Sequence, residues 1–185
     1  MMTEISLNIL DVAENSTRAG ASLVEISVFV DTRENLLTIG IKDDGCGMSE
    51  EQLDQVEDPF FTTRTTRKVG LGIPFFKMAA LSAGGSFRID SKIGEGTVVL
   101  AKFQLNHIDR MPLGDVSGTI YTLIHFHPET DFRYTYRYDE KEFVLDTCQM
   151  KEILGGIPLD TPEVAEYIRE YLTENKMDVD GGAII

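Results

Sequence analysis

The sequence contains little of what proteins use for covalent cross-links, metal cages or membrane spans. Its 185 residues include no tryptophan, only two cysteines and only three histidines. Cys46 and Cys148 stand in unrelated contexts, and two isolated cysteines form neither a disulfide framework nor a zinc site by themselves. No apolar run approaches the ~18 residues of a membrane span, and the first residues lack the basic and apolar regions of a signal peptide. We therefore expect a soluble protein of the reducing cytoplasm.

Positive charge is also scarce. The chain has 17 Lys and Arg against 31 Asp and Glu, which gives a net charge of −14 at pH 7. Such a chain repels the phosphates of nucleic acids and of anionic membranes, so we expect neither as a partner. One local exception, with Arg64, Arg67, Lys68 and Lys77 in a short stretch, is equally consistent with an anion site and with a solvated surface run.

Charge and pattern change near residue 105. Residues 1–105 hold 10 basic and 15 acidic side chains, whereas residues 106–185 hold 7 and 16. Residues 106–115 are typical of a linker that is too short for a freely moving second domain. We therefore divide the chain into a first domain over 1–105 and a strand and helix extension over 106–185. The extension is expected to pack on the first domain, and its strands could extend the same sheet.

Hydrophobic periodicity and turn residues predict the elements of both parts. A helix over 4–19 begins at a Thr3 cap, and a capping box at Ser49 and Gln52 opens a short helix that ends near 56. The other elements expected in the first part are strands over 23–30, 36–42, 86–93 and 97–105, a loop over 57–69 and a helix over 70–83. Those expected in the second part are strands over 119–126, 132–138 and 142–146, helices over 148–154 and 162–172, and a frayed tail over 178–185.

Two segments of the first part place polar groups where they could meet a ligand. Asp11 and Asn15 are four residues apart on the first helix, so their side chains share one face and could orient a water and a hydrated Mg²⁺. Asp43-x-Gly45-x-Gly47-Met48 follows a strand; its glycines allow a flat ligand to approach the backbone, and the carboxylate could accept from an exocyclic amine. Taken alone, the first segment is better explained by a solvated helix face and the second by a glycine-rich turn.

Two further segments follow in order. A polar, cationic loop with Phe60-Phe61-Thr62-Thr63-Arg64 and Lys68 leads into Gly70-Leu71-Gly72-Ile73, and the free N–H groups of such a helix start suit a polyphosphate. Gly94-x-Gly96-Thr97 closes a hairpin. Alone, the phenylalanines would be assigned to the core and the hairpin to simple turn chemistry.

In this order and spacing the segments resemble the ATP-binding superfamily of gyrase, the heat-shock chaperone ATPase, histidine kinases and mismatch-repair ATPases. The resemblance covers residues ~5–105 and implies an α+β fold: a two-layer α/β sandwich with a mixed sheet and helices on one face, the Bergerat ATP-binding fold. It implies ATP and Mg²⁺ as cofactors, with Asn15 as the metal ligand and Asp43 bound to adenine N6. The remaining residues that it implies are Gly45, Gly47, Met48 and Thr97 around the base, and Phe61, Thr62, Arg64, Lys68, Gly70, Leu71 and Gly72 at the phosphates.

Two departures bear on function. Only about ten residues precede the first motif, and His107, His125 and His127 all follow the ATP-binding part, so we expect no self-phosphorylation on a conventional histidine. His125 and His127 alternate on a predicted strand, which would put both imidazoles on one face, usually without a metal. Asp11 stands where hydrolytic and anti-sigma serine-kinase members carry Glu, and it is expected to be the catalytic carboxylate. The loop sequence is more similar to that of histidine kinases.

The expected function is a Mg-ATP-binding, histidine-kinase-like domain that phosphorylates or regulates a separate partner protein in signalling, on His or on Ser/Thr. Two alternatives stay open: a conformational switch driven by ATP hydrolysis, and a nucleotide-gated, anti-sigma-like sequestering protein with little catalysis. The acidic extension favours a protein partner, because it adds surface rather than catalytic residues. A homodimer is also left open.

Overall fold

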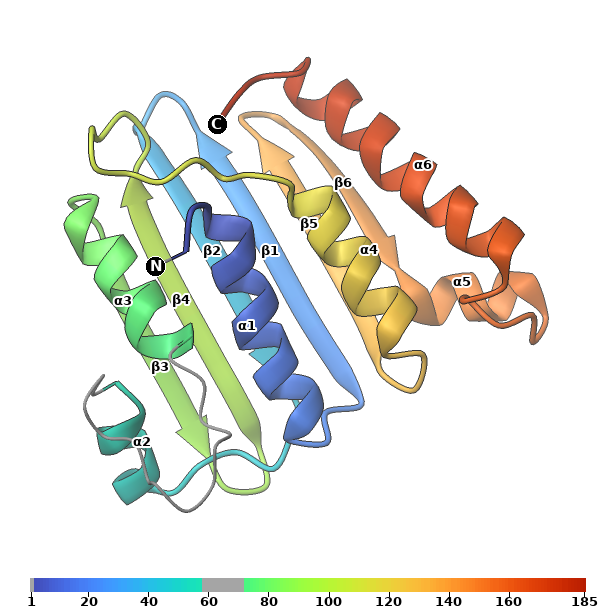
Figure 1. The fold of residues 1–185 in the computed structure, drawn as a ribbon, viewed down its shortest axis with the longest axis horizontal. Helices are drawn as coiled ribbons and strands as arrows, with labels where there is room; N and C mark the ends of the chain where they lie inside the picture. Colours follow the sequence, from blue (N-terminus) through green and yellow to red (C-terminus); the bar gives the residue numbers. More distant parts are fainter. Residues whose placement is uncertain (1, 58–71) are drawn as a thin grey trace.

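The computed structural model describes residues 2–57 and 72–185, which form a six-stranded mixed sheet with helices on one face (Figure 1). The strand order is β3-β4-β2-β1-β5-β6; β1 and β5 run parallel and the other neighbours antiparallel. The strands are β1 (Leu23–Asp31), β2 (Leu36–Asp43), β3 (Ser86–Lys92), β4 (Gly96–Gln104), β5 (Asp131–Tyr138) and β6 (Lys141–Asp146). The helices are α1 (Ile5–Arg18), α2 (Glu50–Val56), α3 (Gly72–Ser82), α4 (Val116–Phe126), α5 (Thr147–Leu154) and α6 (Pro162–Asp180).

The core lies between the sheet and a layer of four helices. In Figure 1, α3, α1, α4 and α6 lie in this order across the sheet, and each contacts the next. Along β1 every second residue is buried, because alternate side chains of a strand point to opposite faces. Val24, Ile26, Val28 and Val30 therefore face the helices. The predicted two-layer α/β sandwich is confirmed.

Residues 106–185 continue this sheet. β5 lies parallel to β1, with Leu23 opposite Asp131, and β6 pairs with β5 at the edge. The expectation that the strands of the extension would extend the sheet is confirmed. Because one sheet runs through both parts, the assignment of residue 105 as a domain boundary stays a prediction.

Residues 119–126, expected as a strand, form part of helix α4. Their β-branched side chains favoured a strand, yet the buried residues Val116, Ile120, Leu123 and Ile124 recur at helical spacing. The Asp115 carboxylate caps the helix by accepting from the Gly118 N–H at 2.8 Å. His125 and His127 consequently do not alternate on a strand, and the expectation of two imidazoles on one strand face was wrong.

The start of α1 and the C-terminal segment that includes α6 also differ from expectation. The N-cap of α1 is Glu4 rather than Thr3, without a side-chain cap bond. The first N–H groups of the helix instead donate to the carbonyls of Pro112 and Leu113, both at 2.9 Å. The linker therefore provides the hydrogen-bond acceptors that a capping side chain would otherwise provide. Helix α6 ends at Asp180, and the expected frayed tail is tied back by a bond from the Leu113 N–H to the Ile185 carbonyl at 2.7 Å.

Across residues 2–57 and 72–185, none of the helices combines the length and the apolar character needed to span a bilayer.

Candidate functional site

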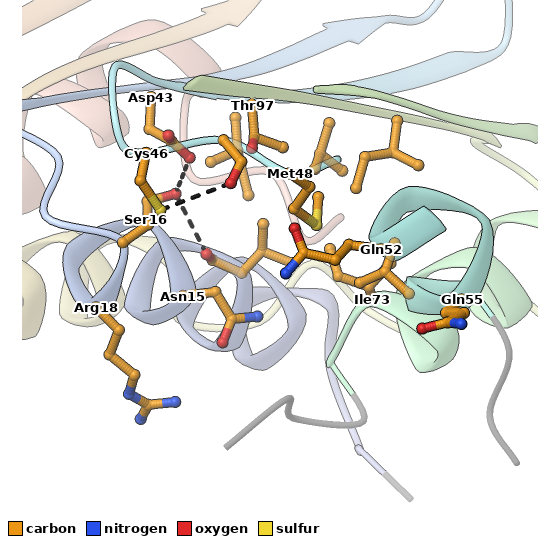
Figure 2. A pocket seen from close by; sticks show the side chains of 17 residues that line it. Asn15, Ser16, Arg18, Asp43, Cys46, Met48, Gln52, Gln55, Ile73 and Thr97 are labelled. Carbon is orange, nitrogen blue, oxygen red and sulfur yellow. Dashed lines mark hydrogen bonds between the residues drawn. The ribbon is translucent and has the colours of Figure 1, made fainter. Parts of the chain in front are cut away.

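A cavity of about 390 Å³ opens at one end of the sandwich, beside α1, α2 and the ends of β2 and β4 (Figure 2). Its walls are largely apolar. Strand residues Ile41, Ile89 and Val99 line it together with Val12 of α1 and Ile73 of α3. Such apolar walls, with polar side chains at particular places among them, suit an organic ligand that carries an apolar ring.

Asp43, the last residue of β2, is a buried carboxylate that lines this cavity. The hydroxyl of Ser16 on α1 donates to its Oδ2 at 2.6 Å (Figure 2). The Gly45 N–H donates to its Oδ1 at 2.9 Å. A carboxylate has about four lone-pair positions. These two bonds therefore fix the orientation of Asp43 and leave acceptor capacity for a ligand amine.

The glycine turn after Asp43 is held between α1 and the β3–β4 hairpin. The Cys46 N–H donates to the Ala19 carbonyl at 3.0 Å, and the Cys46 carbonyl accepts from the Gly94 N–H at 2.8 Å. Gly47 has φ +67°, and a Cβ there would collide with the Lys92 carbonyl, so only glycine fits. Gly47 and Met48 line the cavity, whereas Gly45 acts through its bond to Asp43.

Thr97 faces Asp43 across the sheet. The two residues are partners in the β2–β4 register, and both line the cavity. The Thr97 hydroxyl lies 2.8 Å from that of Ser91, which also accepts from the Met48 N–H at 2.9 Å. Hydrogen bonds thus link the glycine turn to the hairpin that was expected to close the base pocket.

Asn15 lines the cavity from α1, one residue before Ser16. In Figure 2 its amide extends away from Asp43, on the same side as the guanidinium of Arg18. The two ends of the cavity therefore differ: a buried carboxylate lies at one, and an amide and a cation lie at the other. An amide oxygen is a hard ligand of the kind that Mg²⁺ accepts.

Asp11 does not line the cavity; it lies beside the start of α3. A Cβ placed on Gly72 would come within 2.9 Å of the Asp11 Cβ, so the absence of a side chain at Gly72 permits this approach. Burial raises the pKa of Asp11; Arg18 opposes this shift and Glu14 reinforces it. A carboxylate with a raised pKa is a better proton acceptor.

Several predicted residues lie outside the described residues, which exclude 58–71. These are the loop and helix-start residues assigned to the phosphates: Phe61, Thr62, Arg64, Lys68, Gly70 and Leu71. Gly72 is described and begins α3.

The cavity also contains residues that the sequence did not identify. Ser16 shares the buried face of α1 with Ile9 and Val12. A buried hydroxyl requires an acceptor, and this requirement could have pointed to Asp43. Arg18 follows Asn15 by three residues, so helical spacing alone places the two on neighbouring positions. Gln52 and Gln55 line the cavity from α2, whose predicted capping box is confirmed.

Residues 1–107 match the family described as "Histidine kinase-, DNA gyrase B-, and HSP90-like ATPase". The chain belongs to this family, which confirms the resemblance drawn from the motifs and identifies an ATP-binding domain of the kinase-like ATPase type. Among similar curated proteins are the sensor proteins SrrB of Staphylococcus aureus strains NCTC 8325 / PS 47 and COL. Each is 34% identical over 106 residues, which cover 55% of this chain and 18% of the relative. The match thus spans less than a fifth of those relatives.

A solved structure gives an independent comparison of the fold. The crystal structure of the N-terminal domain of a DNA repair protein superposes with a TM-score of 0.52 at 13% identity, over 78% of this chain and 53% of that one. At this identity the likeness concerns the fold alone.

Proposed function

We propose that the protein binds Mg-ATP in this cavity and phosphorylates or regulates a separate partner protein in signalling. The observation that carries the proposal is the position of Asp43: its carboxylate, fixed by Ser16 and Gly45, stands at the end of an apolar cavity. A buried acceptor of this kind selects a base with an exocyclic amine, because a base without one leaves the acceptor unpaired. Adenine is such a base.

The rest of the cavity supports the same orientation of ATP. With the base against Asp43, Thr97 and the glycine turn, the phosphates extend toward Asn15 and Arg18, where an amide and a cation suit a metal-bound polyphosphate. Bound Mg²⁺ would neutralise phosphate charge, and the Asn15 amide oxygen would hold it. The resemblance assigns the remaining phosphate contacts to residues 60–72.

Asp11 is proposed as the base that accepts the proton of the attacking group. Its place on α1, one turn before Asn15, and its raised pKa support this role. Transfer would form a bond between the acceptor oxygen or nitrogen and the γ-phosphorus, and break the bond to the β,γ-bridging oxygen. ADP is the leaving group. If water attacks in place of the acceptor group, the same residues catalyse ATP hydrolysis, and an ATPase is our second candidate function.

The partner is proposed to be a protein in the cytoplasm, since the net charge of −14 disfavours nucleic acid and anionic membrane. A homodimer stays a proposal of the same kind. Incubating the protein with γ-labelled ATP and a cell lysate tests transfer directly: an acid-labile label indicates phosphohistidine, and an acid-stable label indicates Ser or Thr. Release of labelled phosphate without a labelled protein would contradict transfer and support the ATPase.

Asn15→Ala tests the orientation of ATP. We expect this variant to lose the Mg²⁺ dependence of ATP binding in calorimetry, because a metal ligand is removed, while adenosine binding stays unchanged. An equal loss of adenosine affinity would place Asn15 at the base and contradict the assignment.

A further inference from the structure

Glu14 on α1 is shared between two basic side chains from different parts of the chain. Its Oε1 lies 2.8 Å from Nε2 of His127, and its Oε2 lies 3.8 Å from the guanidinium of Arg18. His127 belongs to the C-terminal extension, 113 residues away in sequence. Arg18 lines the cavity. A chain of three side chains therefore connects the extension to the nucleotide site.

The contact between Glu14 and His127 is a hydrogen bond with a defined direction. An ionised carboxylate can only accept, so Nε2 of His127 carries the proton and donates. The C-cap position of His127 on α4, whose backbone N–H donates to the Leu123 carbonyl at 3.0 Å, fixes the backbone behind the ring. Both side chains are 25% exposed, so the bond is partly shielded from water.

The contact between Glu14 and Arg18 is looser. At 3.8 Å it exceeds hydrogen-bond length, and the Arg18 side chain is 56% exposed. Arg18 can thus leave Glu14 for an anion in the cavity. A carboxylate committed to a histidine on one oxygen holds the arginine less tightly than a free carboxylate, which could turn and bind the guanidinium through both oxygens.

We propose that His127 is a positioning residue for the nucleotide: by holding Glu14 toward α4, it keeps Arg18 available to the phosphates of ATP. The inference rests on the proposed function and adds a way for residues 106–185 to set ATP affinity. A partner protein that displaced α4 would break the bond, and Glu14 would then retain Arg18. Binding at the extension would in this way weaken ATP binding.

The alternative is that the bond merely joins α1 to α4. Those helices already contact each other through buried residues of both, and a loosened α1 would disturb Ser16 and Asp43 as much as Arg18. Loss of a purely structural link would therefore weaken the binding of adenosine and of ATP alike. Loss of a positioning link would weaken the binding of ATP alone, because adenosine has no phosphate.

The experiment measures the dissociation constants of Mg-ATP and adenosine by calorimetry for the full chain and its variants. His127→Ala is expected to weaken ATP binding about two- to fivefold, the scale of a partly exposed ion pair, and to leave adenosine binding unchanged. His127→Gln, whose amide can donate from nearly the position of Nε2, is expected to restore wild-type affinity. His107→Ala, a histidine variant in the linker, is the matched control and should bind both ligands normally.

A second variant shows whether the effect runs through Glu14. Glu14→Gln should bind ATP at least as tightly as the wild type, since the amide no longer attracts Arg18, and adding His127→Ala should then change nothing. An unchanged ATP affinity in His127→Ala, an equal loss for adenosine, or a loss that persists beside Glu14→Gln would each overturn the proposal. If the wild type binds neither ligand, the proposed function itself fails; if it binds both and the variants do not separate them, only the role of His127 fails.

Discussion

Asp43 in the first part of the chain and Asp180 in the second are both buried, but they accept hydrogen bonds from different kinds of donor. Within residues 2–57 and 72–185, the donors to Asp43 at the cavity are both neutral: the Ser16 hydroxyl and the Gly45 N–H. Asp180, at the end of α6, accepts from the ammonium of Lys176 at 2.6 Å, from the Tyr136 hydroxyl at 2.8 Å and from the Gly182 N–H at 2.9 Å. Among the described residues, Asp43 therefore retains lone pairs that can accept from a ligand, whereas Asp180 uses its oxygens for hydrogen bonds within the fold.

This difference separates a binding group from a structural one. A buried carboxylate with a cationic partner stabilises the packing around it, and its removal leaves that partner unpaired. Substitution of a buried carboxylate that has only neutral donors should lower the stability of the fold less, and the affinity for the ligand more. We expect variants at the cavity to alter function with the fold intact, and variants at Asp180 to do the opposite.

The largest effect is expected at Asp11. Asp11→Asn should lower phosphate transfer or hydrolysis by about 10²–10⁴-fold, the usual contribution of a positioned base, and should keep ATP affinity within a few-fold because Asp11 does not line the cavity. Initial rates with labelled ATP and calorimetry measure the two quantities. Glu14→Gln, on the same helix, is the control and should change turnover little when ATP is saturating. Full turnover in Asp11→Asn would make the carboxylate structural.

The next largest effect concerns stability. Asp180→Ala should lower the free energy of unfolding by about 3 kcal/mol, because it leaves the buried Tyr136 hydroxyl and the Lys176 ammonium without their acceptor. Urea denaturation followed by circular dichroism measures this change. Asp178→Ala is the matched control: its side chain is exposed on the same helix, so stability should hold. Equal stability of both variants would remove the distinction between the two aspartates.

Asp43→Asn should weaken ATP binding at least tenfold, about 1.4 kcal/mol, because the adenine amine loses its acceptor. The fold should persist, since the amide oxygen can still accept from Gly45 and the amide nitrogen can donate to Ser16. The control is Asp44→Asn, whose exposed carboxylate accepts from Ser22 and Leu23 instead of facing the cavity. Unchanged ATP affinity in Asp43→Asn by calorimetry would refute the adenine assignment.

The smallest effect is a pH dependence. Burial alone would raise the pKa of Asp180, but hydrogen bonds from Lys176, Tyr136 and Gly182 outweigh burial and lower it below 3.8. A carboxyl whose pKa is lower in the folded state stabilises the protein fully at any pH above its pKa in the unfolded state. This stabilisation is lost as the pH falls through the pKa of the folded state. Stability should therefore drop below about pH 4, and Asp180→Asn should make this drop shallower in urea titrations. An unchanged slope would show that other carboxylates govern the acid limb.

Local patterns were enough to predict much of the molecule. Alternating apolar residues predicted β1 and β2, a Ser and a Gln three positions apart predicted the capped start of α2, and the spacing of glycines and acidic residues indicated an ATP-binding family. Each of these signals lies within a few residues of chain, where backbone geometry fixes which side chains share a face. Such signals carry over from sequence to structure because they need no information about the rest of the fold.

The sequence alone indicated the family and, through that resemblance, the sandwich, whereas the residues around the expected base stay a prediction. The tertiary structure decided what depends on distant neighbours. α4 carries β-branched residues that favour a strand, but burial against α1 and α6 makes it a helix, since packing overrides weak propensity. The bonds from Ser16 to Asp43 and from His127 to Glu14 join residues 27 and 113 positions apart. No local pattern specifies such pairs, because they exist only once the helices have packed on the sheet.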